Sequence, residues 1–156
     1  MSESLSPLDM IRANAEMVLA VARDDFGQDI GFDAPGVRWL DGYIQRLHDQ
    51  GDVADAAPLS DRLGSYLGEC IIQAYGGAWQ ETEHGWAVVM DRDLAVFPFN
   101  KTHKHLVDGA GDSVLSLFNS IPALLAHTTG VESEAAPPDD NSKSLIGRIG
   151  NLFRRR

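Results

Sequence analysis

The spacing of apolar residues in this chain changes at the glycine pair Gly76 and Gly77. Before the pair, apolar residues recur at steps of three and four, which is typical of amphipathic helices. After it, over residues 78–99, short apolar runs are separated by turn residues, which is typical of antiparallel strands. Because glycine enters the left-handed conformation without penalty, the pair also predicts the end of the preceding helix. The sequence therefore predicts helices first and a small sheet after them.

Three helices are expected before the sheet. The first begins at Pro7 after a capping Ser6, since proline suits the first helical position and serine suits the cap. The second follows a turn at Asp33, and the third covers residues 59–75 and is the most apolar. The apolar stripes of all three helices are long enough to build one core.

The third helix carries two features of its own. Gly64 and Gly68 lie four residues apart and remove side chains from one face, at a propensity cost of about 1 kcal/mol each. We expect a neighbouring element to approach that face closely. Cys70 lies on the apolar face, where a core role fits better than a nucleophile, which needs an exposed and electropositive setting. Glu69 belongs to a polar strip and is expected to be a surface or second-layer carboxylate rather than a general acid.

The strand-like region predicts a three-stranded antiparallel meander over residues 79–82, 86–90 and 94–99. Residues 100–110 are expected to form a loop with short strand content. Asp112 is then expected to cap a further helix.

These elements predict an α+β protein in four parts. Residues 1–5 are expected to be disordered, and residues 6–126 to form the globular domain, with N-terminal helices packed on the meander and a further helix after it. Residues 127–143 are rich in proline, acids and small polar residues and predict a flexible linker. Residues 144–156, called the tail below, return to helical spacing.

The charge is divided unevenly along the chain. Residues 1–142 hold 23 acidic and eight basic residues, whereas residues 143–156 hold five basic residues and no acidic one. An acidic body repels phosphate backbones, so nucleic-acid binding is not expected. The sequence shows no apolar run long enough to span a membrane and no signal peptide, which favours a cytoplasmic bacterial protein.

The tail has the composition of an amphipathic helix that lies on a surface. At 1.5 Å per residue it is about 20 Å long, too short to cross a hydrocarbon core of about 30 Å. Three destinations fit it: an anionic membrane, which would place the protein at the inner membrane surface, a groove on a partner protein, or the chain's own acidic body. The residues expected to make these contacts are Leu145, Ile146, Arg148, Ile149, Leu152, Phe153, Arg154, Arg155 and Arg156.

No constellation in the sequence predicts catalysis, a metal or a cofactor. His103 and His105 flank Lys104 and would need His84 or an acid to complete a metal site, so a solvated loop is the expected setting. No phosphate-binding glycine loop and no nucleophile elbow are present.

Four aromatic residues of the strand region leave a choice between two roles. They are expected to pack in the core, with a ligand-binding groove on the sheet as the alternative. These residues are Trp79, Trp86, Phe97 and Phe99.

The stretch LGSYLGECIIQAYGGAWQ, residues 63–80, is followed by HGWAVVM and by a helix with GDSV at its start. With these motifs, residues 35–125 resemble an uncharacterised family of small bacterial domains in which a leucine-glycine-glutamate helix ends in Gly-Gly-x-Trp before a meander. The resemblance implies an α+β fold and no catalytic residues. Some such small acidic proteins resemble immunity or accessory proteins beside bacterial toxins.

The sequence thus favours a non-enzymatic protein-binding or accessory module whose tail provides a second, weak attachment to a partner or membrane surface. The alternatives are an immunity-type protein that neutralises a bacterial toxin and an enzyme of unidentified chemistry.

Overall fold

The computed structural model describes residues 5–51 and 56–130, and its fold class is α+β, as predicted. The helices are α1 (Pro7–Phe26), α2 (Ala34–Asp49), α3 (Ala56–Tyr75), α4 (Pro98–Asp108) and α5 (Val114–Gly130). The strands are β1 (Ala78–Thr82), β2 (Gly85–Val89) and β3 (Ala95–Val96), and short 3₁₀ turns lie at Asp91–Asp93 and Ala110–Asp112.

The predicted cap of α1 at Ser6 is confirmed, and the predicted turn at Asp33 supplies the cap of α2. The Ser6 hydroxyl accepts a hydrogen bond from the Asp9 backbone N–H at 3.1 Å, and the Asp33 carboxylate accepts one from Gly36 at 3.0 Å. Each bond satisfies a backbone donor that has no partner inside the helix. Gly27 then ends α1 in the left-handed conformation, with φ of 66°.

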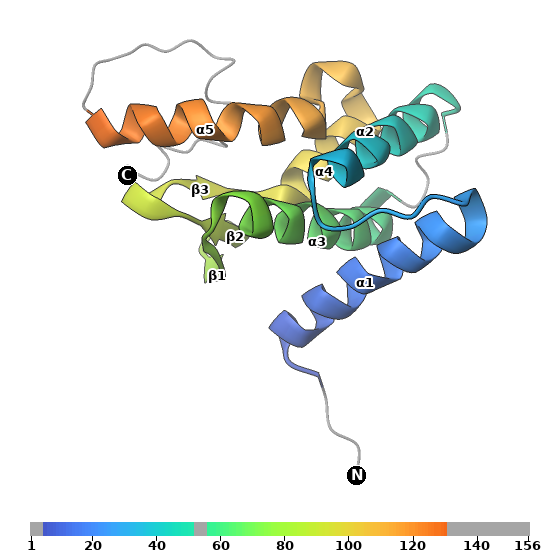
Figure 1. Ribbon diagram of the computed structural model, residues 1–156, viewed down its shortest axis with the longest axis horizontal. Coiled ribbons are helices and arrows are strands. Elements are labelled where there is room, and N and C mark those ends of the chain that lie inside the picture. Colours follow the sequence, from blue (N-terminus) through green and yellow to red (C-terminus); the bar gives the residue numbers. More distant parts are fainter. Residues whose placement is uncertain (1–4, 52–55, 131–156) are drawn as a thin grey trace.

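Helix α3 occupies the centre of the molecule, with α1 on one side and α5 on the other (Figure 1). Its fully buried side chains include Tyr66, Leu67 and Ile71. It begins at Ala56, earlier than the predicted start at residue 59, because Pro58 is tolerated in the first turn of a helix.

The sheet is the predicted antiparallel meander in the order β1-β2-β3. Trp79 pairs with Val88, and Val88 pairs in turn with Val96. The third strand is shorter than predicted, because Pro98 has no N–H for the ladder and instead occupies the first position of α4.

The prediction of a loop over residues 100–110 is wrong, because most of this segment is the helix α4. Its buried positions do follow helical spacing, but Lys101, Thr102 and His105 among them are polar. A hydrophobicity pattern therefore shows no stripe at this place.

The predicted cap at Asp112 is also wrong. The Ser113 hydroxyl accepts a hydrogen bond from the Ser116 N–H at 3.2 Å at the start of α5, whereas Asp112 lies in the preceding 3₁₀ turn. Helix α5 continues through Pro122 to Gly130, so the expected linker from residue 127 begins within a helix.

Candidate functional site

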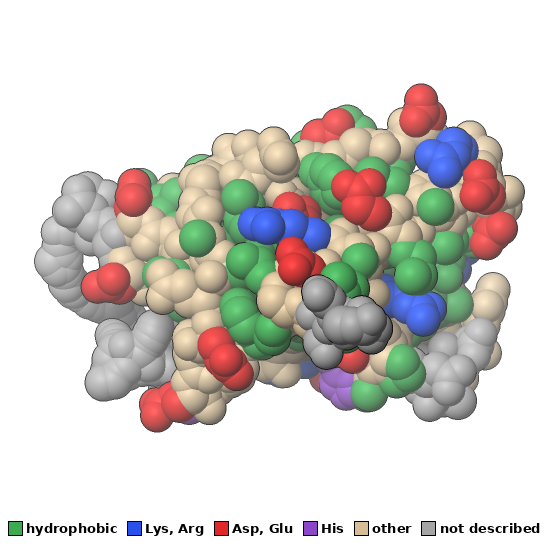
Figure 2. Space-filling view, turned by 90° about the horizontal axis from the view of Figure 1, so that it is seen from below, with side chains coloured by type: hydrophobic (Ala, Val, Ile, Leu, Met, Phe, Trp, Pro, Cys, Tyr) green, Lys and Arg blue, Asp and Glu red, His purple; other side chains and the backbone are tan. Residues whose placement is uncertain are grey.

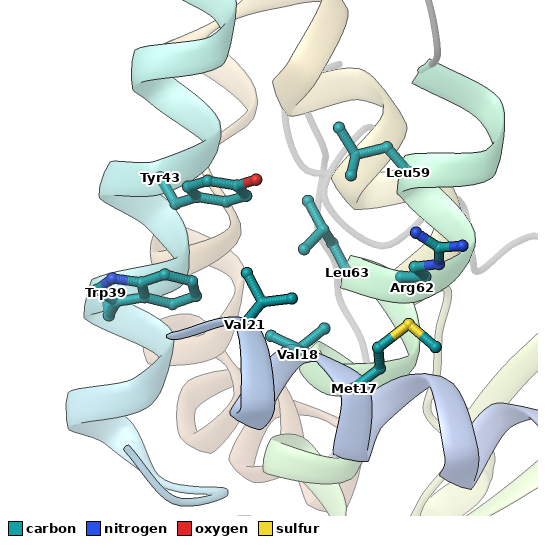
Figure 3. A pocket seen from close by; sticks show the side chains of 8 residues that line it. All are labelled: Met17, Val18, Val21, Trp39, Tyr43, Leu59, Arg62 and Leu63. Carbon is teal, nitrogen blue, oxygen red and sulfur yellow. The ribbon is translucent and has the colours of Figure 1, made fainter. Parts of the chain in front are cut away.

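An apolar cavity of about 100 Å³ opens between α1, α2 and α3 (Figure 3). We call it the α1–α3 groove. Figure 3 shows side chains from all three helices around one central space, with the Arg62 guanidinium at its edge. The groove is lined by Met17, Val18, Val21, Trp39, Tyr43, Leu59, Arg62 and Leu63.

Two aromatic side chains of α2, Trp39 and Tyr43, form one wall of the groove, and helical spacing places them on the same face. Trp39 and Tyr43 lie four residues apart on α2, and their rings stack with centroids 5.1 Å apart and an interplanar angle of 10°. Phe26, at the end of α1, meets both rings edge-on at 5.8 and 5.5 Å. The three rings hold one another in place, so the wall is formed before any ligand arrives.

Exposed methionines extend this apolar surface along α1. Met10 and Met17 lie seven residues apart, two helical turns, and remain 52% and 42% exposed. Figure 2 views the side of the molecule on which α1 lies in Figure 1, and it shows hydrophobic side chains interspersed with acidic ones. Methionine adapts to varied apolar partners because its side chain is flexible and polarisable.

Arg62 is the charged member of the groove. Within the part of the chain that the structure describes, its guanidinium makes no ion pair or hydrogen bond. A free guanidinium beside an apolar cavity offers a planar fork of donors to a carboxylate.

A second and more polar cavity lies where α3, β2 and α4 meet, with a volume of about 270 Å³. We call it the aromatic hollow. It includes three of the four aromatic residues singled out in the sequence. Its lining residues are Ala57, Ser60, Asp61, His84, Gly85, Trp86, Phe97, Phe99, Asn100 and His103.

The fourth aromatic residue, Trp79, belongs to the core, where its ring stacks on Phe99 at 5.4 Å. Its indole N–H donates to Glu69 at 2.9 Å. Glu69 therefore supports a buried aromatic ring, which agrees with its expected second-layer role.

The hollow contains a serine and a histidine, but their geometry does not activate the serine. The Ser60 hydroxyl donates to the Ala56 carbonyl at 2.6 Å. His103 Nδ1 lies 3.4 Å from the same oxygen, so the ring is the donor of that contact. A general base would have to accept the serine proton instead.

The two histidines of the expected solvated loop lie in different environments. His103 lines the hollow, whereas His105 is fully buried, so the solvated-loop prediction is wrong for His105. The described residues hold no group of three or more metal-ligating side chains.

A buried polar cluster surrounds His105, and the sequence did not predict it. His105 Nε2 lies 2.9 Å from the Gln45 side-chain oxygen, and Nδ1 accepts from the Val114 N–H at 3.3 Å and lies 3.7 Å from Asp41. Burial lowers the pKa of His105, while the Asp41 carboxylate acts in the opposite direction. The cluster fixes α2 against α4 and α5.

Lys101 is the second unexpected buried group, with only 4% of its side chain exposed. Its ammonium lies 3.4 Å from the Asp112 carboxylate. Burial lowers the pKa of Lys101, and the charge of Asp112 opposes that shift. A buried ion pair of this kind costs desolvation and favours one geometry over others.

Cys70 is fully buried, as predicted for a core residue. Burial raises the pKa of its thiol to about 12. The thiolate that a nucleophilic role requires is therefore scarce at neutral pH.

The predicted contact residues of the tail lie outside the described residues. Over the described part of the chain, no helix combines the length and apolar character needed to cross a membrane.

Comparisons with protein-family models, curated proteins and solved structures find no match. The resemblance of residues 63–80 and the following motifs to an uncharacterised bacterial family stays a prediction.

Proposed function

We propose that this chain is a non-enzymatic protein-binding module and that the α1–α3 groove receives an amphipathic helix of a partner protein. The observation that carries the proposal is the combination of an open apolar cavity with exposed methionines beside it. Exposed apolar surface of this kind marks interaction sites, because leaving it in water costs free energy. A groove between helices suits the apolar face of another helix.

The residue types in the groove fit the centre of a protein interface. Tryptophan, tyrosine and arginine supply most of the large contributions to binding in protein complexes. Trp39, Tyr43 and Arg62 supply all three around one cavity. We infer that the partner inserts an apolar side chain and places a carboxylate near Arg62.

The enzyme alternative has weaker support. Ser60 is engaged with a backbone carbonyl, and Cys70 is buried with a raised pKa. The Ser60 hydroxyl does not donate its proton to the neighbouring His103, and the Cys70 thiol stays protonated, so neither side chain is activated as a nucleophile.

The tail completes the proposal as a second attachment. Its apolar residues and arginines suit the surface of an anionic membrane, where each basic residue contributes about 1 kcal/mol. The linker would allow the acidic body to remain more than one Debye length, about 8 Å, from the lipid, where salt screens the repulsion between them.

Photo-crosslinking in the source cells tests the groove. A photoreactive amino acid at Met17 is expected to give one discrete protein adduct. The same amino acid at Val107, a 46% exposed apolar position on α4 outside the groove, provides the matched control. Equal adducts at both positions, or none at Met17, would contradict the proposed binding surface.

A further inference from the structure

We propose that the aromatic hollow binds a small organic ammonium ion that carries N–H donors beside a flat apolar group. The hollow shares no lining residue with the α1–α3 groove, so this inference is independent of the proposed protein-binding function. It concerns a second site on the same domain.

The apolar side of the hollow is built from aromatic faces. Trp86 comes from β2, Phe97 follows β3, and Phe99 lies in the first turn of α4. All three are only partly buried, so ring surface remains available to a ligand. Trp79 stacks behind Phe99 and fixes its position. The negative face of an aromatic ring attracts cations.

The polar side of the hollow offers acceptors. Because the Ser60 hydroxyl donates to Ala56, the contact between Ser60 and His103 fits the tautomer in which Nδ1 is the donor and Nε2 is the acceptor. Asn100 adds an exposed amide oxygen. These groups are complementary to a ligand with N–H donors.

The carboxylate of Asp61 favours a positively charged ligand. Its carboxylate lines the hollow and makes no ion pair or side-chain hydrogen bond among the residues that the structure describes. No lysine or arginine is among the described lining residues. An anion would meet Asp61 with no described lysine or arginine beside it, whereas an ammonium ion would gain both the carboxylate and the ring faces.

The volume of the hollow limits the size of the ligand. A volume of about 270 Å³ lies just below the usual range for small-molecule sites, which begins at about 300 Å³. An amine with one aromatic ring fits this space. A lysine side chain of another protein carries the same charge but has no flat apolar group. The experiment must therefore distinguish a free aromatic amine from a protein lysine.

Titration of the full-length protein with matched probes tests the assignment. The indole N–H signal of Trp86, assigned with a Trp86→Phe variant, reports binding by NMR. We expect 2-phenylethylamine to shift this signal saturably, with an affinity about fivefold or more above that of neutral 2-phenylethanol. We expect 3-phenylpropionate to bind more weakly than the alcohol, and n-butylamine, which mimics lysine, more weakly than the aromatic amine.

Two variants locate the charge recognition. Asp61→Asn is expected to remove the preference for the amine over the alcohol, whereas Asp25→Asn, an exposed position on α1 outside the hollow, is expected to keep it. Equal binding of amine and alcohol by the wild type, tighter binding of the carboxylate, or no shift of Trp86 with any probe would overturn the proposal. Equal binding of n-butylamine and 2-phenylethylamine would overturn the aromatic part of it.

Discussion

The indole N–H of Trp79 donates a 2.9 Å hydrogen bond to Glu69, while the six-membered ring of the same side chain lies against Gly68. Two adjacent residues of α3 thus position the first strand of the sheet. Glu69 accepts the hydrogen bond from Trp79, and Gly68, which has no side chain, leaves room for the indole ring. Because Gly76 and Gly77 reverse the chain between them, the segment from Gly68 to Trp79 acts as one structural unit.

This contact predicts that Gly68→Ala destabilises the fold, although alanine is the better helix former. A Cβ atom at Gly68 would lie 2.1 Å from a ring carbon of Trp79, so the indole must move. We expect a loss of about 1–3 kcal/mol in the free energy of unfolding, measured by chemical denaturation. Gly42→Ala is the matched control, because only the end of Arg46 lies within 4 Å, and it should stabilise α2 by about 0.5–1 kcal/mol. A Gly68→Ala protein as stable as the wild type would show that this face is open.

His105 predicts a pH dependence of stability. Burial lowers the pKa of His105 in the folded protein below its ordinary value of 6.5. The unfolded chain therefore binds more protons as pH falls through about 6.5, so the free energy of unfolding should decrease from about pH 7 downward until the folded pKa is passed. His105→Gln should flatten this slope, and His84→Gln, at an exposed position, should not. The same slope in His105→Gln and the wild type would assign the effect to other groups.

Burial of Cys70 predicts a thiol that does not react in the native state. With its pKa at about 12, the group is almost entirely protonated at about pH 8 and has no access to solvent. A chromogenic disulfide reagent should modify it only after denaturation, whereas Ser116→Cys, at an exposed position, should supply a rapidly reacting thiol. Rapid modification of native wild-type protein would mean that α3 opens readily.

The tail is expected to confer salt-sensitive binding to anionic vesicles. Charge supplies attraction, but apolar contact must contribute as well, because salt screens the charges. Co-sedimentation should therefore decrease when Ile149→Glu and Phe153→Glu are combined. Equal sedimentation of the two proteins, or none for the wild type at low salt, would favour a protein groove as the destination of the tail.

The sequence predicted those parts of the fold that rest on local patterns. The cap at Ser6, the turn into α2 at Asp33, the meander and the close approach at Gly64 and Gly68 all follow from residue type and spacing. It did not predict α4, because that helix buries polar residues whose partners come from distant segments.

The sequence did not predict the α1–α3 groove either. The four-residue spacing of Trp39 and Tyr43 on α2 places their rings side by side, but the cavity exists only because α1 and α3 pack beside them. Nothing local to α2 specifies that packing, whereas the exposed apolar side chains of Met10 and Met17 on α1 were an available signal.

Partner retention by a groove variant tests whether the α1–α3 groove binds a partner protein. Tagged wild type, Met17→Glu and the control Val107→Glu would be expressed in the source cells, purified and quantified for the same co-purifying protein. Both variants place a charge at an exposed apolar position, so both should fold, but only Met17→Glu places it in the groove. We predict that Met17→Glu lowers retention about tenfold or more and that Val107→Glu leaves it unchanged. Retention of the partner by Met17→Glu at the wild-type level would show that the groove is not the binding surface.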